Sequence, residues 1–282
     1  LNDAGINNVY LQLKQGDFTW FEPLAFSLIE DQPFVETHTI SAATKFETVD
    51  LTPHFNDAVT NIFKNEYLSP RPAVPTLQLP TQGIGNWAYP LTTANISDSG
   101  LRVKAGVKNE VLINNIPFKT TATEKKNIVF TSMWDNYPDS VVLPLSGTAS
   151  YAYFLMAGST NPMQSRMVNG TVVVNYTDGT SSLLELKNPE NWWPIEQDYF
   201  IDGFAFTAGE TKPTRVLLKT GEVIPANYKY SGIKGFSNFG IDGGAATVLH
   251  LKLNPHKQLK SITLKTIAND VVIGMMSVTL VR

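Results

Sequence analysis

The stretch that decides the fold is Thr171-Val-Val-Val-Asn-Tyr-Thr177, followed by Asp178-Gly179 and then by Ser181-Ser-Leu-Leu-Glu-Leu186. Both flanking runs are rich in apolar residues, and the β-branched and aromatic residues of the first are typical of strands. Asp-Gly between two such runs is the strongest short hairpin signal in the chain, because glycine adopts the positive φ that a tight turn needs. The stretch therefore predicts two antiparallel strands joined by a turn.

Strand candidates of the same kind lie on both sides of this hairpin. In residues 248–253 the three leucines share one face, while His250 and Lys252 share the other, which is the period of two of a half-buried strand. Turn residues separate such candidates about every 8–12 residues, and helices do not alternate with strands, so an all-β sandwich or jelly roll is predicted. The expected strands are 112–118, 128–133, 141–145, 149–156, 171–177, 181–186, 199–206, 215–220, 248–253, 261–267 and 271–281.

The first hundred residues are less regular. Residues 9–15 alternate as a strand does, Gly16-Asp17 predicts a turn, and 18–29 and 39–49 continue in a strand-like manner. Five prolines between residues 68 and 90 predict extended, loop-like chain, because proline removes ladder donors. We therefore expect an N-terminal β region at 1–100, partly integral to the sandwich, and the main β-domain at 101–282.

One short helix is expected within the N-terminal region. Thr52 can cap it and Pro53 suits the first helical position. Phe55, Val59, Ile62 and Phe63 would then fall on one face. With at most one or two short helices in the chain, the fold class remains all-β.

Composition excludes several functional classes. Of the 282 residues, 43% are hydrophobic and 17% are charged, and the formal net charge is −3. Without a basic stripe, nucleic acid is not an expected partner. The chain has no cysteine, which excludes disulfides, thiolate metal sites and a cysteine nucleophile. No run reaches the ~18 apolar residues of a membrane span, so no membrane insertion is expected. Phosphate-binding loops, nucleophile elbows and zinc-protease motifs are also missing.

Three predicted loops combine aromatic residues with amides and charged groups. Sugar recognition requires flat aromatic faces that stack on a pyranose, together with amides, carboxylates or arginine for its hydroxyls, and loops at the end of a β-scaffold can supply both. The alternative is that the same rings close the ends of the core. The candidate carbohydrate-binding residues are Trp134, Asn136, Tyr137, Gln164, Arg166, Trp192 and Trp193.

Carboxylates in these loops offer two weaker hypotheses. A glycosidase needs two carboxyl groups, about 5–5.5 Å apart for retention or roughly 6.5–9.5 Å apart for inversion, and Glu196, Asp198 and Asp135 are weak catalytic candidates. Oxygen ligands in loops also suit a structural Ca²⁺, with Asp135, Asp139 and Asp242 as weak candidates. Surface acids in turns are the simpler explanation. No other cofactor is expected.

Several segments together resemble a known kind of domain. These are Gly147–Gly158, Asn169–Gly179, Asn191-Trp-Trp193 and Leu264–Leu280. They are similar to the galactose-binding-like jelly roll attached to secreted bacterial glycoside hydrolases and lyases. More narrowly, Trp134-Asp-Asn-Tyr-Pro138, Gly158–Gln164 and Trp193–Tyr199 resemble an uncharacterised family of large secreted Bacteroidetes proteins described as candidate glycosidases.

The resemblance implies a setting and no catalytic residue. It implies a secreted, periplasmic or outer-surface protein whose signal peptide has been removed, with a glycan and a catalytic domain of the same full-length protein as partners. The favoured function is a non-catalytic carbohydrate-binding or accessory module for polysaccharide degradation. Two alternatives stay open: a purely structural brace for a catalytic domain, and a glycoside hydrolase in its own right.

Overall fold

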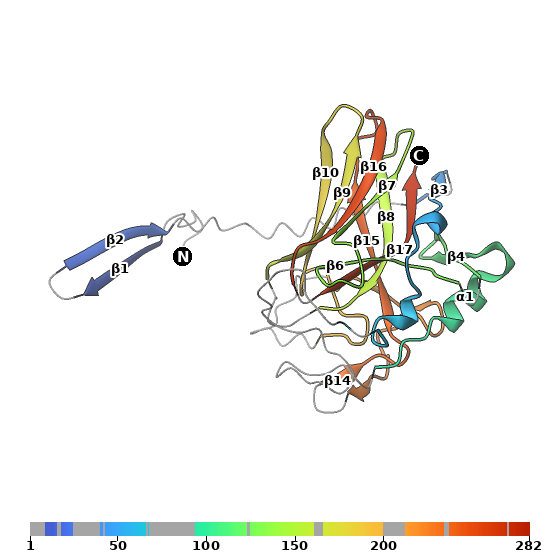
Figure 1. Ribbon diagram of the computed structural model, residues 1–282, viewed down its shortest axis with the longest axis horizontal. Coiled ribbons are helices and arrows are strands. Elements are labelled where there is room, and N and C mark those ends of the chain that lie inside the picture. Colours follow the sequence, from blue (N-terminus) through green and yellow to red (C-terminus); the bar gives the residue numbers. More distant parts are fainter. Residues whose placement is uncertain are drawn as a thin grey trace. The chain divides into compact units, whose positions relative to one another are not determined.

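The computed structural model describes residues 9–15, 18–24, 40–41, 43–65, 67, 94–122, 125–160, 166–199, 212–233, 237–269 and 271–282. Contacts divide the chain into two units. The first is Leu1–His38 with Gly209–Thr211, and the second is Thr39–Ala208 with Lys212–Arg282. In the first unit the structure describes an antiparallel hairpin of β1 (Val9–Gln15) and β2 (Phe18–Leu24), drawn in blue in Figure 1. The expected strand at 9–15 is confirmed.

The second unit contains two antiparallel sheets (Figure 1). The smaller sheet has the strand order β10 (Ser181–Lys187), β9 (Val168–Tyr176), β16 (Leu259–Thr266) and β7 (Ser140–Pro144). The larger has the order β12 (Glu222–Val223), β11 (Thr214–Leu217), β15 (Ala245–Lys252), β8 (Tyr151–Gly158), β17 (Val272–Val281) and β3 (Phe46–Thr48), and β6 (Val129–Ser132) also pairs with β17. A small hairpin joins β13 (Ser231–Ile233) to β14 (Ser237–Gly240).

The hairpin predicted around Asp178-Gly179 is β9–β10. Gly179 has a φ of +86°, and Asp178 Oδ1 accepts hydrogen bonds from the Thr180 amide and hydroxyl at 2.9 and 2.6 Å. The register pairs Ser181 with Asn175. The predicted turn chemistry therefore forms the turn, and the all-β class is confirmed.

One apolar core lies between the two sheets. Alternate residues of the smaller sheet point into it, such as Val172 and Val174 of β9 and Ile262 of β16. They meet Phe154 of β8 and Val278 of β17 from the larger sheet. The two sheets therefore share a hydrophobic interior, as in a β-sandwich.

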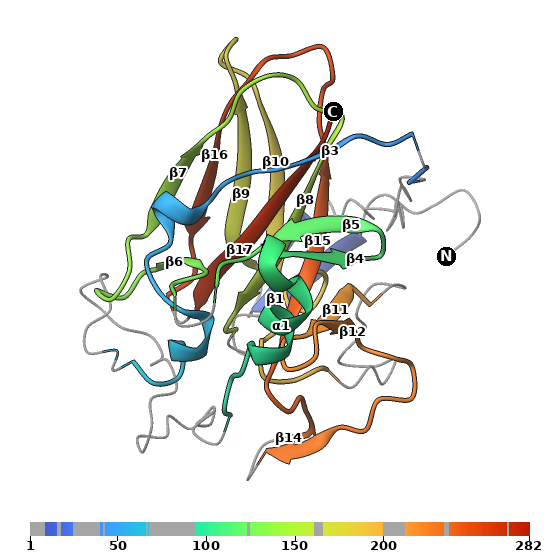
Figure 2. The ribbon, with the colours of Figure 1, turned by 90° about the vertical axis from the view of Figure 1, so that its right-hand side faces the viewer.

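A second apolar core covers the opposite face of the larger sheet. Tyr153 and Leu155 of β8 belong to it, together with residues of the segments 59–67 and 96–118. Figure 2 shows part of this layer, α1 and the β4–β5 hairpin, in front of the larger sheet. Because β8 and β17 are buried on both faces, β8 and residues 272–276 of β17 are continuous apolar runs without alternation.

This second layer contains the short helices. They are η1 (Thr52–His54), η2 (Val59–Asn61), α1 (Ser99–Ala105) and η3 (Gly106–Lys108). The single helix expected from Thr52 is wrong, because the chain between η1 and η2 is extended. The Asn56 amide donates to the Phe130 carbonyl and accepts from its N–H, both at 2.8 Å, and Asp57 forms a bridge with Ile128. These contacts replace helical hydrogen bonds.

The single strand expected at 112–118 is a hairpin of β4 (Glu110–Ile113) and β5 (Ile116–Lys119). Its turn residues, Asn114 and Asn115, have φ values of +51° and +64°, which asparagine tolerates. The expected strand at 199–206 lies almost entirely outside the described residues. Within the described ranges, every helix is too short to cross a lipid bilayer.

Candidate functional site

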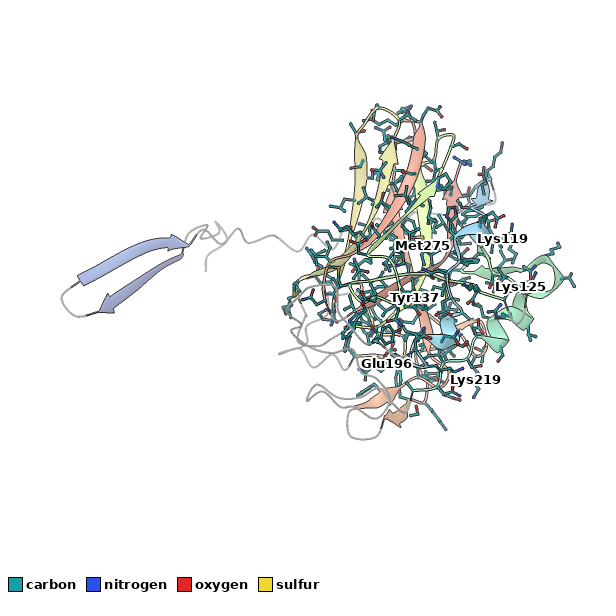
Figure 3. The ribbon with its side chains drawn as sticks, viewed as in Figure 1. Lys119, Lys125, Tyr137, Glu196, Lys219 and Met275 are labelled. Atoms are coloured by element: carbon teal, nitrogen blue, oxygen red, sulfur yellow. The ribbon has the colours of Figure 1, made fainter. Side chains whose placement is uncertain are left out.

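The first aromatic cluster, Trp134 and Tyr137, lies in the interior, and Figure 3 labels Tyr137 among the packed side chains. The ring centroids of Trp134 and Tyr67 are 6.2 Å apart in an edge-on arrangement, and the Tyr137 hydroxyl donates to Asp57 Oδ2 at 2.6 Å. Burial above all, followed by neighbouring groups that include Asp57, holds the pKa of Tyr137 far above its usual range. The loop after β6 therefore anchors the chain around Asp57 to the larger sheet.

Trp192 fills the core between the two sheets and has no exposed surface. Its Nε1 donates to the Ser159 carbonyl at 3.1 Å. Gly158 fits between this ring and the neighbouring strand, because a Cβ at this position would lie 2.1 Å from the Val272 carbonyl oxygen and 2.7 Å from the ring. Trp192 is therefore a core residue whose polar atom is satisfied internally.

Trp193 is also buried, with 1% of its surface exposed. Its Nε1 donates to the Pro189 carbonyl at 2.6 Å, and its ring meets Tyr199 edge-on at 5.1 Å between centroids. The ammonium of Lys212 lies 5.5 Å from the ring centroid, within the range of a cation–π interaction. Trp193 therefore supports a charged side chain instead of facing a ligand.

The predicted sugar-binding residues consequently do not form an exposed aromatic platform within the described part of the chain. Trp134, Trp192 and Trp193 have separate packing environments, since burying a large ring removes much apolar surface from water. Asn136 and Arg166 are exposed. The main-chain N–H of Arg166 donates a hydrogen bond to the Asn188 carbonyl at 2.6 Å. Gln164 lies outside the described residues.

A buried ionic network lies next to Trp193. The Asp198 carboxylate accepts hydrogen bonds from Arg215 Nε at 3.1 Å, from the Tyr230 hydroxyl at 2.6 Å and from Lys212 Nζ. The side chains of Asp198 and Arg215 are each 1% exposed. Burial raises the pKa of Asp198, but the three donors together hold it below its usual value, so the carboxylate is ionised.

Arg215 connects this network to the sheet. Its guanidinium also donates to Thr247 Oγ1 at 2.6 Å and to the carbonyls of Pro194 and Gln197. The segment around Asp198 is therefore held to β11 and β15 by a fork of hydrogen bonds, as expected of a buried arginine.

Glu196 lies two residues before Asp198 and has a different environment. It is 2% exposed, and its Oε2 has no hydrogen-bond partner within the described chain (Figure 3 labels it). Burial raises the pKa of Glu196 to about 8, although Arg215 opposes the shift. Glu196 is therefore neutral at pH 7 while Asp198 is ionised. The two candidate acids therefore differ in charge at pH 7. Neither of them lines the groove at the β12–β11 edge of the larger sheet.

A groove lies at the β12–β11 edge of the larger sheet, which Figure 2 labels. It has a volume of about 390 Å³, within the range of small-ligand sites. It is lined by Lys212, Pro213, Thr214, Arg215, Val223, Ile224, Pro225, Ala226 and Tyr230. The groove therefore combines apolar surface, one tyrosine ring and the cations of the buried network.

Sequence reasoning missed Lys212, Arg215 and Tyr230 as site residues. One signal was present for Arg215, which begins the otherwise apolar run Arg215-Val-Leu-Leu218 and so requires a buried partner. Nothing in the spacing indicates that Lys212 and Tyr230, eighteen residues apart, share one carboxylate.

The remaining carboxylates stand apart from this network. Asp135 is exposed, Asp139 accepts a hydrogen bond from the Ser140 hydroxyl at 3.3 Å, and Asp242 pairs with Lys219 at 2.5 Å. Within the residues that the structure describes, no group of three acidic or histidine side chains is arranged to hold a metal ion. The calcium site stays a prediction.

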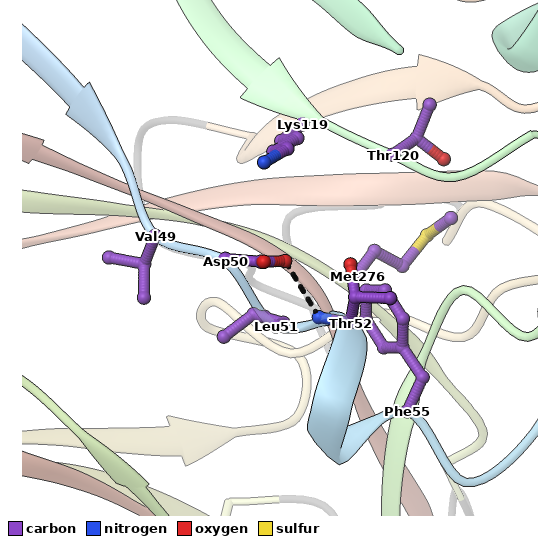
Figure 4. Close-up of a pocket in the computed structure, with 8 residues that line it drawn as sticks. All are labelled: Val49, Asp50, Leu51, Thr52, Phe55, Lys119, Thr120 and Met276. Atoms are coloured by element: carbon purple, nitrogen blue, oxygen red, sulfur yellow. Dashed lines mark hydrogen bonds between the residues drawn. The ribbon is translucent and has the colours of Figure 1, made fainter.

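A second hollow, shown in Figure 4, is not a ligand site. Val49, Asp50, Leu51, Thr52, Phe55, Lys119, Thr120 and Met276 line it, but it leaves no space for a water molecule. The dashed line in Figure 4 marks the hydrogen bond that the Thr52 N–H donates to Asp50 Oδ1 at 3.0 Å.

The described residues therefore form a mostly β-structured protein with a charged groove at one edge of its larger sheet. The sequence matches no protein-family model and no curated protein.

Proposed function

We propose that this chain is a non-catalytic accessory module of a secreted carbohydrate-active protein and that it binds a saccharide in the groove at the β12–β11 edge. The galactose-binding-like jelly roll and the Bacteroidetes glycoside hydrolase setting belong to this proposal and rest on the sequence resemblance. In this proposal the binding site does not include Trp134, Trp192 or Trp193, although Trp193 contacts a groove residue, Lys212.

The observation that carries the proposal is the composition of the groove wall. Tyr230 gives it an aromatic side whose hydroxyl is fixed to Asp198 at 2.6 Å, and Pro213 and Pro225 add rigid apolar surface. Lys212 places a hydrogen-bond donor at the same groove. A sugar requires apolar contact for its C–H face and directed donors for its oxygens, and a pre-organised wall lowers the entropic cost of binding.

The structural brace is a second candidate, and the burial of Trp134, Trp192 and Trp193 favours it. A catalytic role is less well supported. Asp198 is occupied by three donors and Glu196 is enclosed, so neither carboxyl group has room for a glycosidic oxygen or a water nucleophile.

The test is isothermal titration of residues 1–282 against a panel of neutral and acidic oligosaccharides. Ala226 lines the groove and is exposed, so Ala226→Met adds uncharged bulk without removing a network contact. Val107→Met is the matched control, because Val107 is fully exposed in η3 and away from the groove-lining residues. Binding that Ala226→Met abolishes and Val107→Met leaves unchanged supports the proposal. Absence of binding across the panel favours the structural brace.

A further inference from the structure

Among the described residues that line the groove, the two charged ones are both cationic. They are Lys212 and Arg215. Asp198 lies behind them and supplies one negative charge to their two positive charges. Glu196 adds none at pH 7, because burial raises its pKa to about 8. The exposed Glu222 precedes Val223, and residues adjacent in a strand point to opposite faces. Among the residues that the structure describes, one positive charge of this partly buried network therefore has no counter-charge.

Lys212 brings this charge to the surface. Of its three N–H donors, one is directed to Asp198 and one to the Tyr230 hydroxyl at 3.1 Å, so within the described part of the chain one remains for a ligand. The rings of Trp193 and Tyr230 lie 5.5 and 5.8 Å from its nitrogen and restrict where the ammonium can lie. The side chain is 36% exposed, which leaves the remaining donor accessible.

We infer, on the basis of the saccharide function proposed above, that the groove selects an acidic saccharide whose anionic group accepts a hydrogen bond from Lys212. A carboxylate of a uronic acid and a sulfate ester share this chemistry. The sugar ring would lie against Tyr230 and Pro225. A neutral saccharide would leave the extra positive charge uncompensated, so the groove discriminates by charge as well as by shape.

The experiment compares three ligand classes on the intact chain by isothermal titration: a neutral gluco-oligosaccharide, an oligogalacturonide and a sulfated galacto-oligosaccharide. We expect one or both acidic ligands to bind at least about tenfold more tightly than the neutral one, since hydrogen bonds to charged groups are the stronger class. The two acidic ligands distinguish a carboxylate from a sulfate. Raising salt from about 0.1 M to about 1 M should weaken acidic binding only, as the Debye length falls from about 10 Å to about 3 Å.

Two lysine variants locate the effect. Lys212→Gln should lower acidic affinity about tenfold or more, while Lys212→Arg should retain most of it. Lys257→Gln is a matched control, because Lys257 also lies over a tyrosine ring, Tyr176 at 5.6 Å, and pairs with an aspartate, Asp178 at 2.9 Å. Its exposure of 32% is close to that of Lys212.

The outcomes separate the inference from the proposed function. Equal binding of neutral and acidic ligands, or acidic binding that neither salt nor Lys212→Gln weakens, overturns the inference and leaves saccharide binding intact. Binding of no ligand overturns both. If Lys212→Gln does not fold, the salt dependence of the unmodified chain and the Lys212→Arg variant decide the question.

Discussion

Replacing Glu196 with glutamine should make the protein more stable at neutral pH. The side chain is buried with an unpaired Oε2, and its pKa of about 8 lies well above its ordinary value of 4.5. In the folded protein at pH 7 the carboxyl group is therefore protonated, whereas in the unfolded chain it is ionised. Glutamine has nearly the same shape as the protonated acid and cannot ionise, so it does not favour the unfolded state in this way.

The sign and size of the effect follow from proton linkage. Because the folded state binds more protons than the unfolded state between pH 4.5 and 8, stability falls as the pH rises through this window. At pH 7 the accumulated loss is about 3–4 kcal/mol, from about 2.5 pH units at about 1.4 kcal/mol each. Below pH 4.5 the contribution of Glu196 is constant, so the difference between the two proteins there measures only the change of side chain.

Urea unfolding followed by tryptophan fluorescence, from pH 4.5 to 8, measures this dependence. The unfolding free energy of Glu196→Gln minus that of the unmodified protein should rise by about 1.4 kcal/mol per pH unit between about pH 5 and pH 7.5. Glu222→Gln, at an exposed position of β12, should change the stability little and serves as the control. Parallel pH profiles for Glu196→Gln and the unmodified protein would refute the reasoning, because they would mean that Glu196 is already ionised in the folded state.

Three further substitutions test other parts of the structure by thermal or urea unfolding. Asp198→Asn should cost about 3–5 kcal/mol at pH 7, since it leaves the buried guanidinium of Arg215 without a counter-charge. Because the pKa of Asp198 is lowered, its stabilisation is present at neutral pH and should be lost as the pH falls below about 4. Gly158→Ala should cost about 3 kcal/mol or more, since its Cβ would meet the Val272 carbonyl oxygen at 2.1 Å and the Trp192 ring at 2.7 Å, and an unchanged melting temperature would contradict that packing. Tyr137→Phe should cost about 1–3 kcal/mol, because Asp57 loses a buried donor at 2.6 Å; equal stability would show that water replaces the hydroxyl.

The strands that face water on one side were predictable, and the reason is their period. Residues 249–252 of β15 and the hairpin β9–β10 alternate because one face is buried in the core and the other faces solvent. The hairpin turn at Gly179 was predictable from local chemistry alone. The elements of the second layer were not. The Asn56 side chain bonds the backbone of Phe130, seventy-four residues away, and no local pattern indicates such a contact.

The candidate site was less predictable, because sequence identifies residue types but not the direction in which they point. Trp192 and Trp193 were correctly placed next to a turn, but an indole in a loop is compatible with packing and with ligand contact. Their N–H groups donate to nearby main-chain carbonyls, those of Ser159 and Pro189, and this distinguishes the two roles. The presence of these acceptors depends on where the main chain passes each indole, and only the fold determines this.

The same argument explains why charge, and not aromatic content, identifies the groove. A tryptophan can be buried at no electrostatic cost once its N–H has an acceptor, so a cluster of tryptophans does not require a ligand. A buried arginine requires a compensating anion, and Arg215 therefore implies Asp198. Among the described residues, the network then holds two cations, Lys212 and Arg215, and one carboxylate, Asp198, because Glu196 is protonated at pH 7. In the inference drawn above, the anionic group of an acidic saccharide supplies the balancing charge.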